Sequence, residues 1–418
     1  MSTYTLKYGK GSISFALPDN WVIHTLKPHE PEPLPFEETL LRSIEHPTGE
    51  IPFSHWVRNF KNILIIVPDI TRYAGTERIL PVLFKRFLKD VNIKILFALG
   101  NHRKHTIEEQ KSIVSESIYE TAPCVDHDCF DNNNLTSFGF TSSGLEVLLN
   151  SSLVSADAVI VIGSINFHYL AGFGGGRKAL FPGVAGYKTI LGIHGKVFNK
   201  DKPGKHKYAR SGILEGNPMH EEIMQGVGLI KKPMFLVNTV LDDKKNLLNV
   251  FSGHINSAHV EGCRWFMEHF ACMPQEKADV VIAGAGGFPK DINFIQTHKT
   301  IEHAMGAVKD GGTLIVIGQC QDGLGNDDFL QWFEYETIEE MEFHVRRADK
   351  VYAQTAYATR LKAQRCRIIL VSDLDNDAVT KMGLIPKNDI ADAIASMDKD
   401  TGCVCNIIPD GSNTLVCF

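Results

Sequence analysis

The sequence predicts two doubly wound α/β domains, and three observations support this. First, apolar runs alternate with helix-like segments in the first half of the chain, at residues 62–67, 93–99 and 158–162. Second, each run ends in a loop of glycine and polar residues, which is typical of the carboxyl ends of parallel strands. Third, the alternation restarts near residue 278. We therefore expect one domain at 1–273 and another at 274–418, with the active site in the interdomain cleft.

The first domain begins with a hairpin, because residues 4–8 and 12–17 alternate in polarity around Gly9-Lys10-Gly11. Four prolines make the connector at 28–35 stiff and extended. Helical spacing of apolar residues then recurs in four segments, at residues 36–46, 76–89, 187–198 and 255–270.

The second domain begins after Met273-Pro274, which ends the preceding helix. Its first strand, at 278–283, runs into a glycine-rich loop and a helix at 291–307. Further elements alternate in the same way, with strands at 313–317 and 367–371, a helical region at 329–364, and a last helix and strand. This alternation predicts a second doubly wound sheet.

The composition is that of a soluble globular protein, with 44% hydrophobic and 22% charged residues in a chain of 418. A formal net charge of −6 gives no electrostatic support for binding nucleic acid or a membrane surface. The N-terminus lacks the apolar segment of a secretory signal, and no apolar run reaches the ~20 residues of a membrane helix. Nine scattered cysteines without a C-x-x-C pair indicate reduced thiols and a cytoplasmic location.

The chain is organised around a glycine-rich stretch that runs from His168 to His194. Its glycines let backbone N–H groups approach an anion closely, and Arg177 and Lys178 add positive charge. The spacing matches neither a phosphate-binding Walker loop nor a dinucleotide-binding fingerprint. A glycine cluster alone is as typical of a turn as of a site, but two histidines and two cations in one segment favour a site.

Two further polar groups follow strands of the first domain. Asp69, Thr71 and Arg72 could clamp an anion, since arginine offers a planar fork for a carboxylate or phosphate, or could form a solvated turn with an internal ion pair. His102, near His105, could be a general acid or base, although a surface or capping histidine is the commoner interpretation of such a residue alone. The sequence leaves these alternatives open.

One polar pair lies in the second domain, where Gln296 and Lys299 occupy the helix at 291–307. Their i, i+3 spacing puts them on one helix face. They could bind a common target there, or the face could be an ordinary exposed one.

Some clusters invite a metal interpretation that the sequence does not favour. Asp126-His127-Asp128 lies between Cys124 and Cys129, but its spacing and composition favour a solvated loop. His254 and His259 flank a helix start and are expected to be capping or core groups.

Taken together, the motifs resemble those of the nickel-dependent lactate racemase family, in the family's order and across essentially the whole chain. The resembling segments are Asp69-Ile70-Thr71-Arg72, Gly100-Asn101-His102-Arg103, His168 to Lys178, Pro182 to Ile190, and Gly286-Gly287-Phe288-Pro289 continuing to Gln296 and Lys299. The glycine-rich stretch is the specific part, because its glycines, lysine and two histidines fall at the family's spacings.

The resemblance implies a nickel-pincer cofactor, a pyridinium-3-thioamide-5-thiocarboxylic acid mononucleotide whose sulfurs and one carbon hold nickel. The family's covalent lysine falls on Lys178, and its single protein nickel ligand falls on His194. One imidazole with soft sulfur donors is chemically reasonable for Ni(II). The acid/base histidines fall on His102 and His168. The other residues implied to bind the cofactor are Asp69, Thr71, Gly174, Gly175, Gly176 and Arg177, and those implied to bind substrate are Arg72, Gln296 and Lys299.

The implied activity is that of a racemase or epimerase of lactate or a related 2-hydroxy acid. The reaction would run by proton-coupled hydride transfer to the cofactor through a 2-keto acid, with one histidine for each hand of substrate. A non-catalytic nucleotide or sugar-phosphate binding protein and a metal-dependent hydrolase are the alternatives. Departures from the family's pattern at Tyr169, Ile295 and Tyr352 leave the substrate side chain open. The expected partner is the small-molecule substrate, without nucleic acid or membrane, and the sequence does not predict the oligomeric state.

Overall fold

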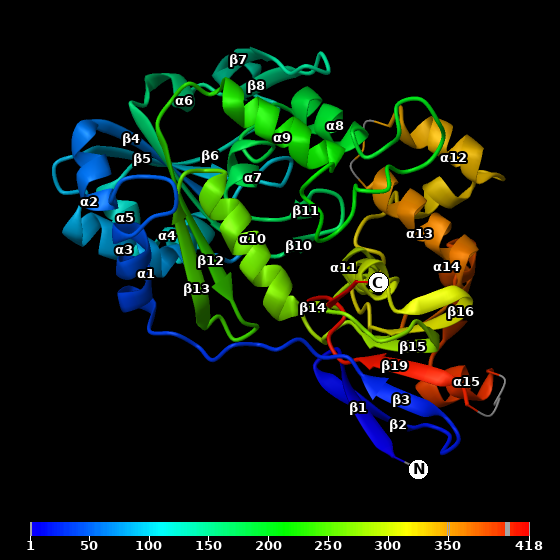
Figure 1. The fold of residues 1–418 in the computed structure, drawn as a ribbon. Helices are drawn as coiled ribbons and strands as arrows, with labels where there is room; N and C mark the ends of the chain where they lie inside the picture. Colours follow the sequence, from blue (N-terminus) through cyan, green and yellow to red (C-terminus); the bar gives the residue numbers. More distant parts are fainter. Residues whose placement is uncertain (1, 349, 351, 398–401, 418) are drawn as a thin grey trace. The chain divides into compact units, whose positions relative to one another are not determined.

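The computed structural model describes residues 2–348, 350, 352–397 and 402–417. The chain divides into two compact units, which are described separately (Figure 1). The first unit comprises Pro31–Val197 and Lys205–Glu268, and the second comprises residues 1–30, 198–204 and 269–418. Each unit contains a six-stranded, mainly parallel sheet with helices, which confirms the predicted α/β fold with two domains.

The sheet of the first unit has the strand order β13-β12-β9-β4-β5-β6. These strands are β4 (Asn62–Pro68), β5 (Asn92–Ala98), β6 (Cys124–Asp126), β9 (Ala158–Ser164), β12 (Met234–Leu241) and β13 (Leu247–Gly253). All neighbours pair in parallel except β12 and β13. The chain enters at the inner strand β4, builds outward through β5 and β6, and returns to the other side of β4 with β9. The strand order therefore reverses between β4 and β9, which is the doubly wound arrangement.

The helices of the first unit are α1 (Phe36–Glu45), α2 (Phe53–Trp56), α3 (Thr76–Arg86), α4 (Ile107–Val114), α5 (Glu116–Thr121), α6 (Ser152–Ser155), α7 (Arg177–Leu180), α8 (Tyr187–Gly195), α9 (Pro218–Leu229) and α10 (Ser257–Phe270). Alternate strand residues such as Ile65 and Ile160 join one core cluster with residues of α1, α3, α4 and α5. The intervening residues, such as Leu64 and Val161, are buried as well, and α7 lies against β4 and β9. Because both faces of the sheet are covered, its strands are apolar at consecutive positions.

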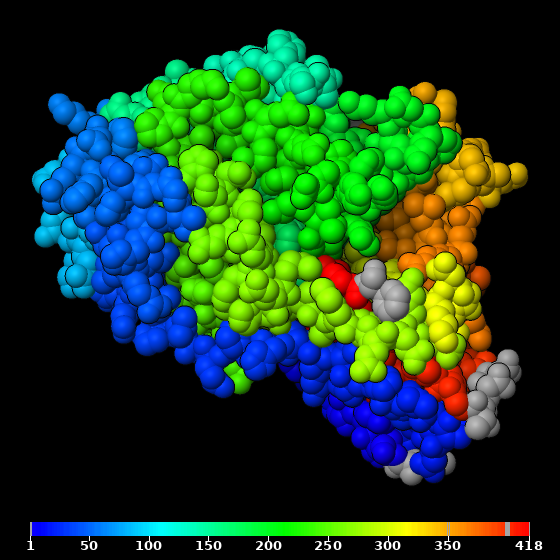
Figure 2. Space-filling model, viewed as in Figure 1, coloured from blue at the N-terminus to red at the C-terminus, as the bar shows by residue number. Residues whose placement is uncertain are grey.

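Two short hairpins, which the sequence analysis did not predict, belong to the first unit. β7 (Leu135–Phe140) pairs antiparallel with β8 (Glu146–Asn150), and β10 (Phe167–His168) pairs with β11 (Gly172–Phe173). The first hairpin lies at the surface of the unit, in the teal region of the space-filling view (Figure 2). The second lies between β9 and α7, where it carries His168.

The sheet of the second unit is parallel throughout, in the order β18-β17-β16-β15-β19-β3. Its strands are β3 (Val22–Thr25), β15 (Ala278–Gly284), β16 (Val308–Ile317), β17 (Arg367–Val371), β18 (Ile385–Lys387) and β19 (Val404–Ile408). Its helices are α11 (Phe294–Ala304), α12 (Ile338–Val345), α13 (Ala353–Arg365), α14 (Asn376–Lys381) and α15 (Ile390–Ala395). The predicted helical region at 329–364 is therefore interrupted, with a short 3-10 turn at Leu330–Phe333 before α12 and α13.

The first thirty residues differ from their predicted placement, because they belong to the second unit. The expected hairpin is present, with β1 (Thr3–Tyr8) and β2 (Gly11–Ala16) paired antiparallel. After it, β3 adds to the edge of the second sheet and pairs with β19 through partners such as Val22 and Val404. Pairing with a strand near the other end of the chain, rather than nearness in sequence, decides which unit holds this segment.

All nine cysteines are free thiols. Within the described ranges, no helix combines the length and the apolar character that crossing a membrane requires.

Candidate active site

Three loops that follow β4, β5 and β9 lie at the carboxyl edge of the first unit's sheet. They carry residues 69–72, 100–105 and 168–178. Because β4 and β9 flank the point where the strand order reverses, these loops border the position where open α/β sheets bind ligands. The backbone N–H of Gly100 donates to the carbonyl of Gly183 (2.8 Å), so the second loop also meets the glycine-rich stretch.

Asp69 accepts most of the side-chain hydrogen bonds in the loop after β4. Its buried carboxylate accepts hydrogen bonds from the backbone N–H and hydroxyl of Thr71 (3.0 and 2.6 Å) and from the guanidinium of Arg72 (3.0 Å). It also accepts a short hydrogen bond from His102 on the next loop. Burial acts to raise the pKa of Asp69, but the hydrogen bond to His102 and the charge of Arg72 outweigh it and hold the pKa below its usual range. The carboxylate is therefore ionised at neutral pH.

Asp69 in turn fixes the tautomer of His102. A carboxylate only accepts, so Nδ1 of His102 carries the hydrogen and Nε2 has the lone pair in the neutral ring. The ring is partly exposed, and Nη1 of Arg72 lies 3.5 Å from its Nδ1. A histidine oriented in this way by a buried carboxylate is suited to act as a general base.

The interpretation of residues 126–128 as a solvated loop is wrong, because two of the three side chains are buried. Asp126 accepts hydrogen bonds from Nδ1 of His105 (2.8 Å) and from its backbone N–H (2.7 Å). His127 is a core residue whose Nε2 lies 2.9 Å from the carbonyl of Ala185. β6 brings this segment beside β5, and local sequence composition does not register that pairing.

His168 lies on β10, where Nδ1 accepts hydrogen bonds from the backbone N–H groups of Leu170 (3.3 Å) and Ala171 (3.1 Å). Nδ1 is therefore an acceptor, and Nε2 carries the hydrogen in the neutral ring. The ring stacks on Tyr169, with centroids 5.5 Å apart and planes inclined by 16°. His168 thus holds its Nε2–H in a defined direction.

The glycine-rich loop differs from the expected anion cradle, because two of its N–H groups are already used. Gly174 donates to the carbonyl of Asn166 (2.8 Å), and Gly176 donates to Oδ1 of Asn238 (2.8 Å). A Cβ atom at Gly176 would lie 1.9 Å from Leu236. Gly174 and Gly176 are therefore needed to seat the loop tightly on the strands, and their amides do not face a ligand.

Arg177 also differs from its expected role of binding the cofactor, because its guanidinium is fully buried. Nε donates to Nδ1 of His220 (3.0 Å), and the terminal nitrogens face the carbonyls of Ala171 and Phe173 at 3.3–3.5 Å. Burial lowers its pKa to about 10, which leaves it charged at neutral pH. Arg177 braces the loop from inside.

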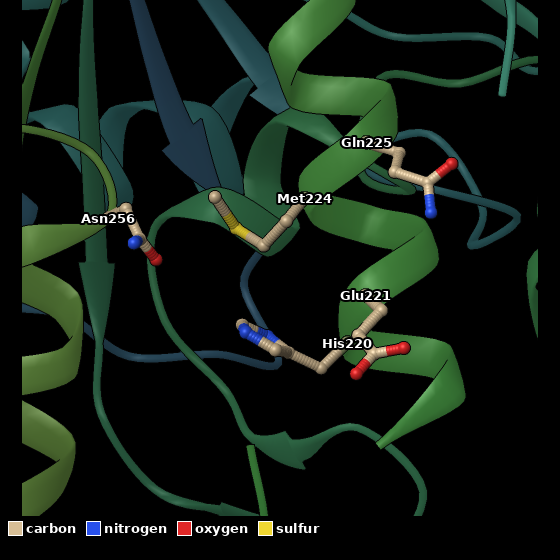
Figure 3. Close-up of a pocket in the computed structure, with 5 residues that line it drawn as sticks. All are labelled: His220, Glu221, Met224, Gln225 and Asn256. Atoms are coloured by element: carbon tan, nitrogen blue, oxygen red, sulfur yellow. The ribbon is translucent and has the colours of Figure 1, made fainter. Parts of the chain in front are cut away.

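His220 links this brace to a cavity of about 510 Å³ on the first unit. Figure 3 shows its ring and the side chain of Met224 pointing toward Asn256, whereas Gln225 points away. Burial, followed by the charge of Arg177, lowers the pKa of His220 to about 3. His220 is therefore neutral and accepts the hydrogen bond from Arg177.

Lys178 and His194 share an electrostatic neighbourhood with Arg72. Burial first, and then the charges of Arg72 and Arg177, hold the pKa of Lys178 well below its usual value. Burial is also the main cause that lowers the pKa of His194 to about 4; the charges of Lys178 and Arg72 add to it, while a hydrogen bond to Ile190 opposes it. Nδ1 of His194 donates to the carbonyl of Ile190 (2.8 Å), so Nε2 has the lone pair. Among the described residues, His, Cys, Asp and Glu side chains form no group of three or more that could hold a metal ion.

Gln296 and Lys299 lie at the start of α11 in the second unit. Their spacing does place them on one face, since Nζ of Lys299 donates to Oε1 of Gln296 (2.7 Å). Asn293 caps the helix by accepting from the backbone N–H of Gln296 (3.0 Å). The two side chains therefore form one polar group rather than two independent ones.

Comparison with known proteins shows which family the chain belongs to. The family model for the lactate racemase N-terminal domain matches residues 8–205, and that for the lactate racemase C-terminal domain matches residues 273–416. The chain belongs to the lactate racemase family. It is 32% identical to the lactate racemase of Thermoanaerobacterium thermosaccharolyticum, over all of this chain and 99% of that protein. It is 30% identical to the lactate racemase of Lactiplantibacillus plantarum, with 91% of each chain covered.

Solved structures agree with this membership of the lactate racemase family. The structure of the lactate racemase apoprotein from Thermoanaerobacterium thermosaccharolyticum matches with a TM-score of 0.88 and 31% identity, over 99% of this chain and 100% of that one. A crystal structure of a Thermotoga maritima protein matches with a TM-score of 0.63 and 18% identity, over 93% and 99% of the two chains, and so shares the fold.

Sequence reasoning missed the residues that support the site of this lactate racemase family member. The sequence predicts a solvated loop at Asp126, and His220 is not among the predicted site residues. His105 was noted only as a neighbour of His102. Their partners are distant in sequence, so no local pattern identifies these residues.

Proposed function

We propose that this member of the lactate racemase family racemises or epimerises lactate or a related 2-hydroxy acid. The observation that carries the proposal is a pair of histidines whose Nδ1 atoms are engaged in opposite senses. Nδ1 of His102 donates to Asp69, whereas Nδ1 of His168 accepts from the backbone. One ring therefore offers a lone pair at Nε2, and the other offers an N–H. Inverting a carbinol centre through a planar intermediate needs groups that can serve the substrate oxygen from two sides.

In this proposal His102 takes the proton of the substrate hydroxyl. The ionised carboxylate of Asp69 stabilises the imidazolium that forms, and it holds the ring so that Nε2 faces the ligand. His168 donates a hydrogen bond from its Nε2–H to the oxygen of the planar intermediate, and the imidazolium of His102 returns its proton to that oxygen when hydrogen is restored to Cα. We assign His168 to the opposite hand of substrate, for which the tautomer with the lone pair on Nε2 would be the base. Direct deprotonation of Cα is disfavoured because the neighbouring carboxylate opposes a second negative charge. Temporary oxidation to a planar 2-keto acid avoids that charge and allows either face to be restored.

The cofactor implied by the sequence resemblance fits the residues present. The depressed pKa of Lys178 favours the neutral amine, the form that an amide-type bond requires. Nε2 of His194 is unprotonated at neutral pH, as a nickel ligand must be. We therefore assign the nickel to His194 and the pyridinium-3-thioamide-5-thiocarboxylic acid mononucleotide to Lys178. When bound, this group would accept and return the hydrogen of the substrate Cα.

Arg72, Gln296 and Lys299 are proposed to hold the substrate. Nη1 of Arg72 donates a hydrogen bond to Asp69. The Arg72 side chain is 55% exposed, so the rest of its guanidinium can pair with the carboxylate of the substrate. The hydrogen-bonded pair of Gln296 and Lys299 offers an amide and an ammonium for the carboxylate or the keto oxygen. Thr71 and Gly175 remain proposed as residues that bind the cofactor.

The test combines activity with chemistry on Lys178. The protein is produced with and without the enzymes that synthesise the cofactor, and each form is examined by peptide mass spectrometry, metal analysis and a panel of enantiopure 2-hydroxy acids. We expect loaded protein to carry an adduct on Lys178 and stoichiometric nickel, and to reduce the optical purity of at least one panel member. Unloaded protein should do none of these.

Each outcome separates parts of the proposal. Racemisation by protein with unmodified Lys178 and without nickel would overturn the cofactor assignment but not the activity. Nickel bound without the adduct would leave His194 in place and remove Lys178. A loaded protein that racemises no 2-hydroxy acid would overturn the proposed function itself.

A further inference from the structure

His105 joins the two loops that carry the proposed catalytic groups of the first unit. It follows β5 and lies three residues after His102, yet its side chain faces the loop after β4. Nε2 of His105 accepts a hydrogen bond from the backbone N–H of Ile70 (3.1 Å), the residue that follows Asp69. We infer that His105, held by Asp126, is a positioning residue that sets Asp69 and Arg72 against His102. The inference rests on the proposed function of that site.

The ring of His105 is fixed on every polar side. Its Nδ1 donates to Oδ1 of Asp126 (2.8 Å), and its backbone N–H donates to Oδ2 of the same carboxylate (2.7 Å). The two side chains are only 2% and 8% exposed, so water does not compete strongly for these hydrogen bonds. Phe97 meets the ring edge to face, with centroids 5.2 Å apart at 73°. The ring therefore has one rotamer and one tautomer, with hydrogen on Nδ1 and the lone pair on Nε2.

The amide of Ile70 is an effective place to hold the loop. Ile70 is 41% exposed, so the hydrogen bond of its backbone N–H supplies the anchor of this residue. Asp69 lies on one side of that amide, and the turn Asp69-Ile70-Thr71-Arg72 continues on the other, closed by the bonds from Thr71 and Arg72 to Asp69. A shift of the Ile70 peptide would therefore move the carboxylate that orients His102 together with the guanidinium proposed to bind substrate.

The two functions of the ring can be separated by substitution. Counted in bonds from Cα, the side-chain oxygen of glutamine occupies the position of Nε2, and the side-chain nitrogen of asparagine occupies the position of Nδ1. His105→Gln can therefore accept from Ile70, whereas His105→Asn can donate to Asp126 but cannot reach Ile70. Lys104→Ala is the matched control, because Lys104 is on the same loop and pairs at the surface with Asp128 (3.1 Å).

Two measurements test the inference. In the cofactor-free protein, hydrogen exchange of the Ile70 amide should accelerate at least tenfold in His105→Asn and change little in His105→Gln and Lys104→Ala. In the loaded enzyme, His105→Asn should lower kcat by about 10- to 100-fold, the range expected when a catalytic group is displaced by about 1 Å. His105→Gln should retain kcat within about threefold of wild type, and Lys104→Ala within about twofold.

A purely structural role for His105 predicts a different pattern. Asparagine and glutamine would then lower kcat equally, in proportion to lost folded protein, and that result would overturn the inference. Unchanged exchange of the Ile70 amide in His105→Asn would overturn it as well, even if wild-type enzyme proved inactive on every 2-hydroxy acid. Inactive wild-type enzyme with the predicted exchange pattern would instead reject the proposed function and leave the anchor on Ile70 established.

Discussion

Gly163→Ala is a sharp test of how the glycine-rich loop is seated. Gly163 lies on β9, and a Cβ atom there would stand 2.7 Å from the backbone nitrogen of Gly176 and 3.0 Å from its Cα. Ordinary contacts begin near 3.4 Å, so the loop would have to retreat by about 0.7 Å. The same Cβ would lie 3.0 Å from Oδ1 of Asn238, which accepts the Gly176 N–H, and so would disturb that hydrogen bond.

The expected cost is that of inserting a methyl group into a packed interior, about 2 kcal/mol within a range of about 1–3. For a unit of this size that corresponds to a fall of about 4–8 °C in the thermal midpoint. Lys178 lies two residues beyond Gly176, so the fraction of protein that carries the adduct should fall as well. Calorimetry of the unloaded protein and peptide mass spectrometry of the loaded protein measure the two effects.

Gly228→Ala is the control for Gly163→Ala. Gly228 lies in α9 with no atom within 4 Å of its added Cβ, so alanine should raise stability by about 0.5–1 kcal/mol through its better helix propensity. If Gly163→Ala melts with wild-type protein and carries the full adduct, the loop is not seated by backbone contact at Gly163, and the reasoning fails.

Three further predictions concern the first unit. His102→Ala and His168→Ala should each lower racemisation by about 10²–10⁴-fold with little change in folding, because both lie outside the core; kinetics and circular dichroism measure this, and full activity in either variant would exclude that residue. The folded pKa of Asp69 lies below its unfolded value of about 3.9, so the ionised carboxylate stabilises the fold above that pH, and this stabilisation is lost as the pH falls further. The thermal midpoint of wild type should therefore drop more steeply than that of Asp69→Asn between about pH 5 and pH 2. Parallel curves for the two proteins would contradict this. Arg177→Met should destabilise by about 2–3 kcal/mol in urea unfolding, since the carbonyls of Ala171 and Phe173 and Nδ1 of His220 lose their donor; an unchanged midpoint and slope would show that the loop does not need this brace.

Three neighbouring strands of the first unit's sheet, β9, β4 and β5, could be predicted because each carries its own signal. The run at 158–162 is apolar at every position, and those at 62–67 and 93–99 are apolar except at Asn62 and Lys94, since helices cover both faces of the sheet. Ligands bind at the carboxyl edge of open α/β sheets, so Asp69 and His102, which follow two of these strands, could be predicted to lie at one edge. In the structure a hydrogen bond joins their side chains.

The supporting contacts could not be predicted, because each depends on pairing between distant segments. The glycines at 174–176 suggested free amides, but Asn166 and Asn238 occupy two of them. Arg177 suggested a ligand contact, yet its guanidinium turns inward to His220. A sequence shows which residues can donate and accept, whereas tertiary packing decides which partners they find.

The edge strand β3 affects the order in which the two sheets fold during synthesis. Its partner β19 is made almost last, since Val22 pairs with Val404, so the first thirty residues leave the ribosome long before their sheet exists. The sheet of the first unit is complete once residue 253 has emerged and can form earlier. Until then the nascent β3 edge is unpaired, and it offers chaperones and proteases an accessible segment. Circular permutation that encodes β3 directly after β19 would turn this late contact into a local one and shorten that exposure.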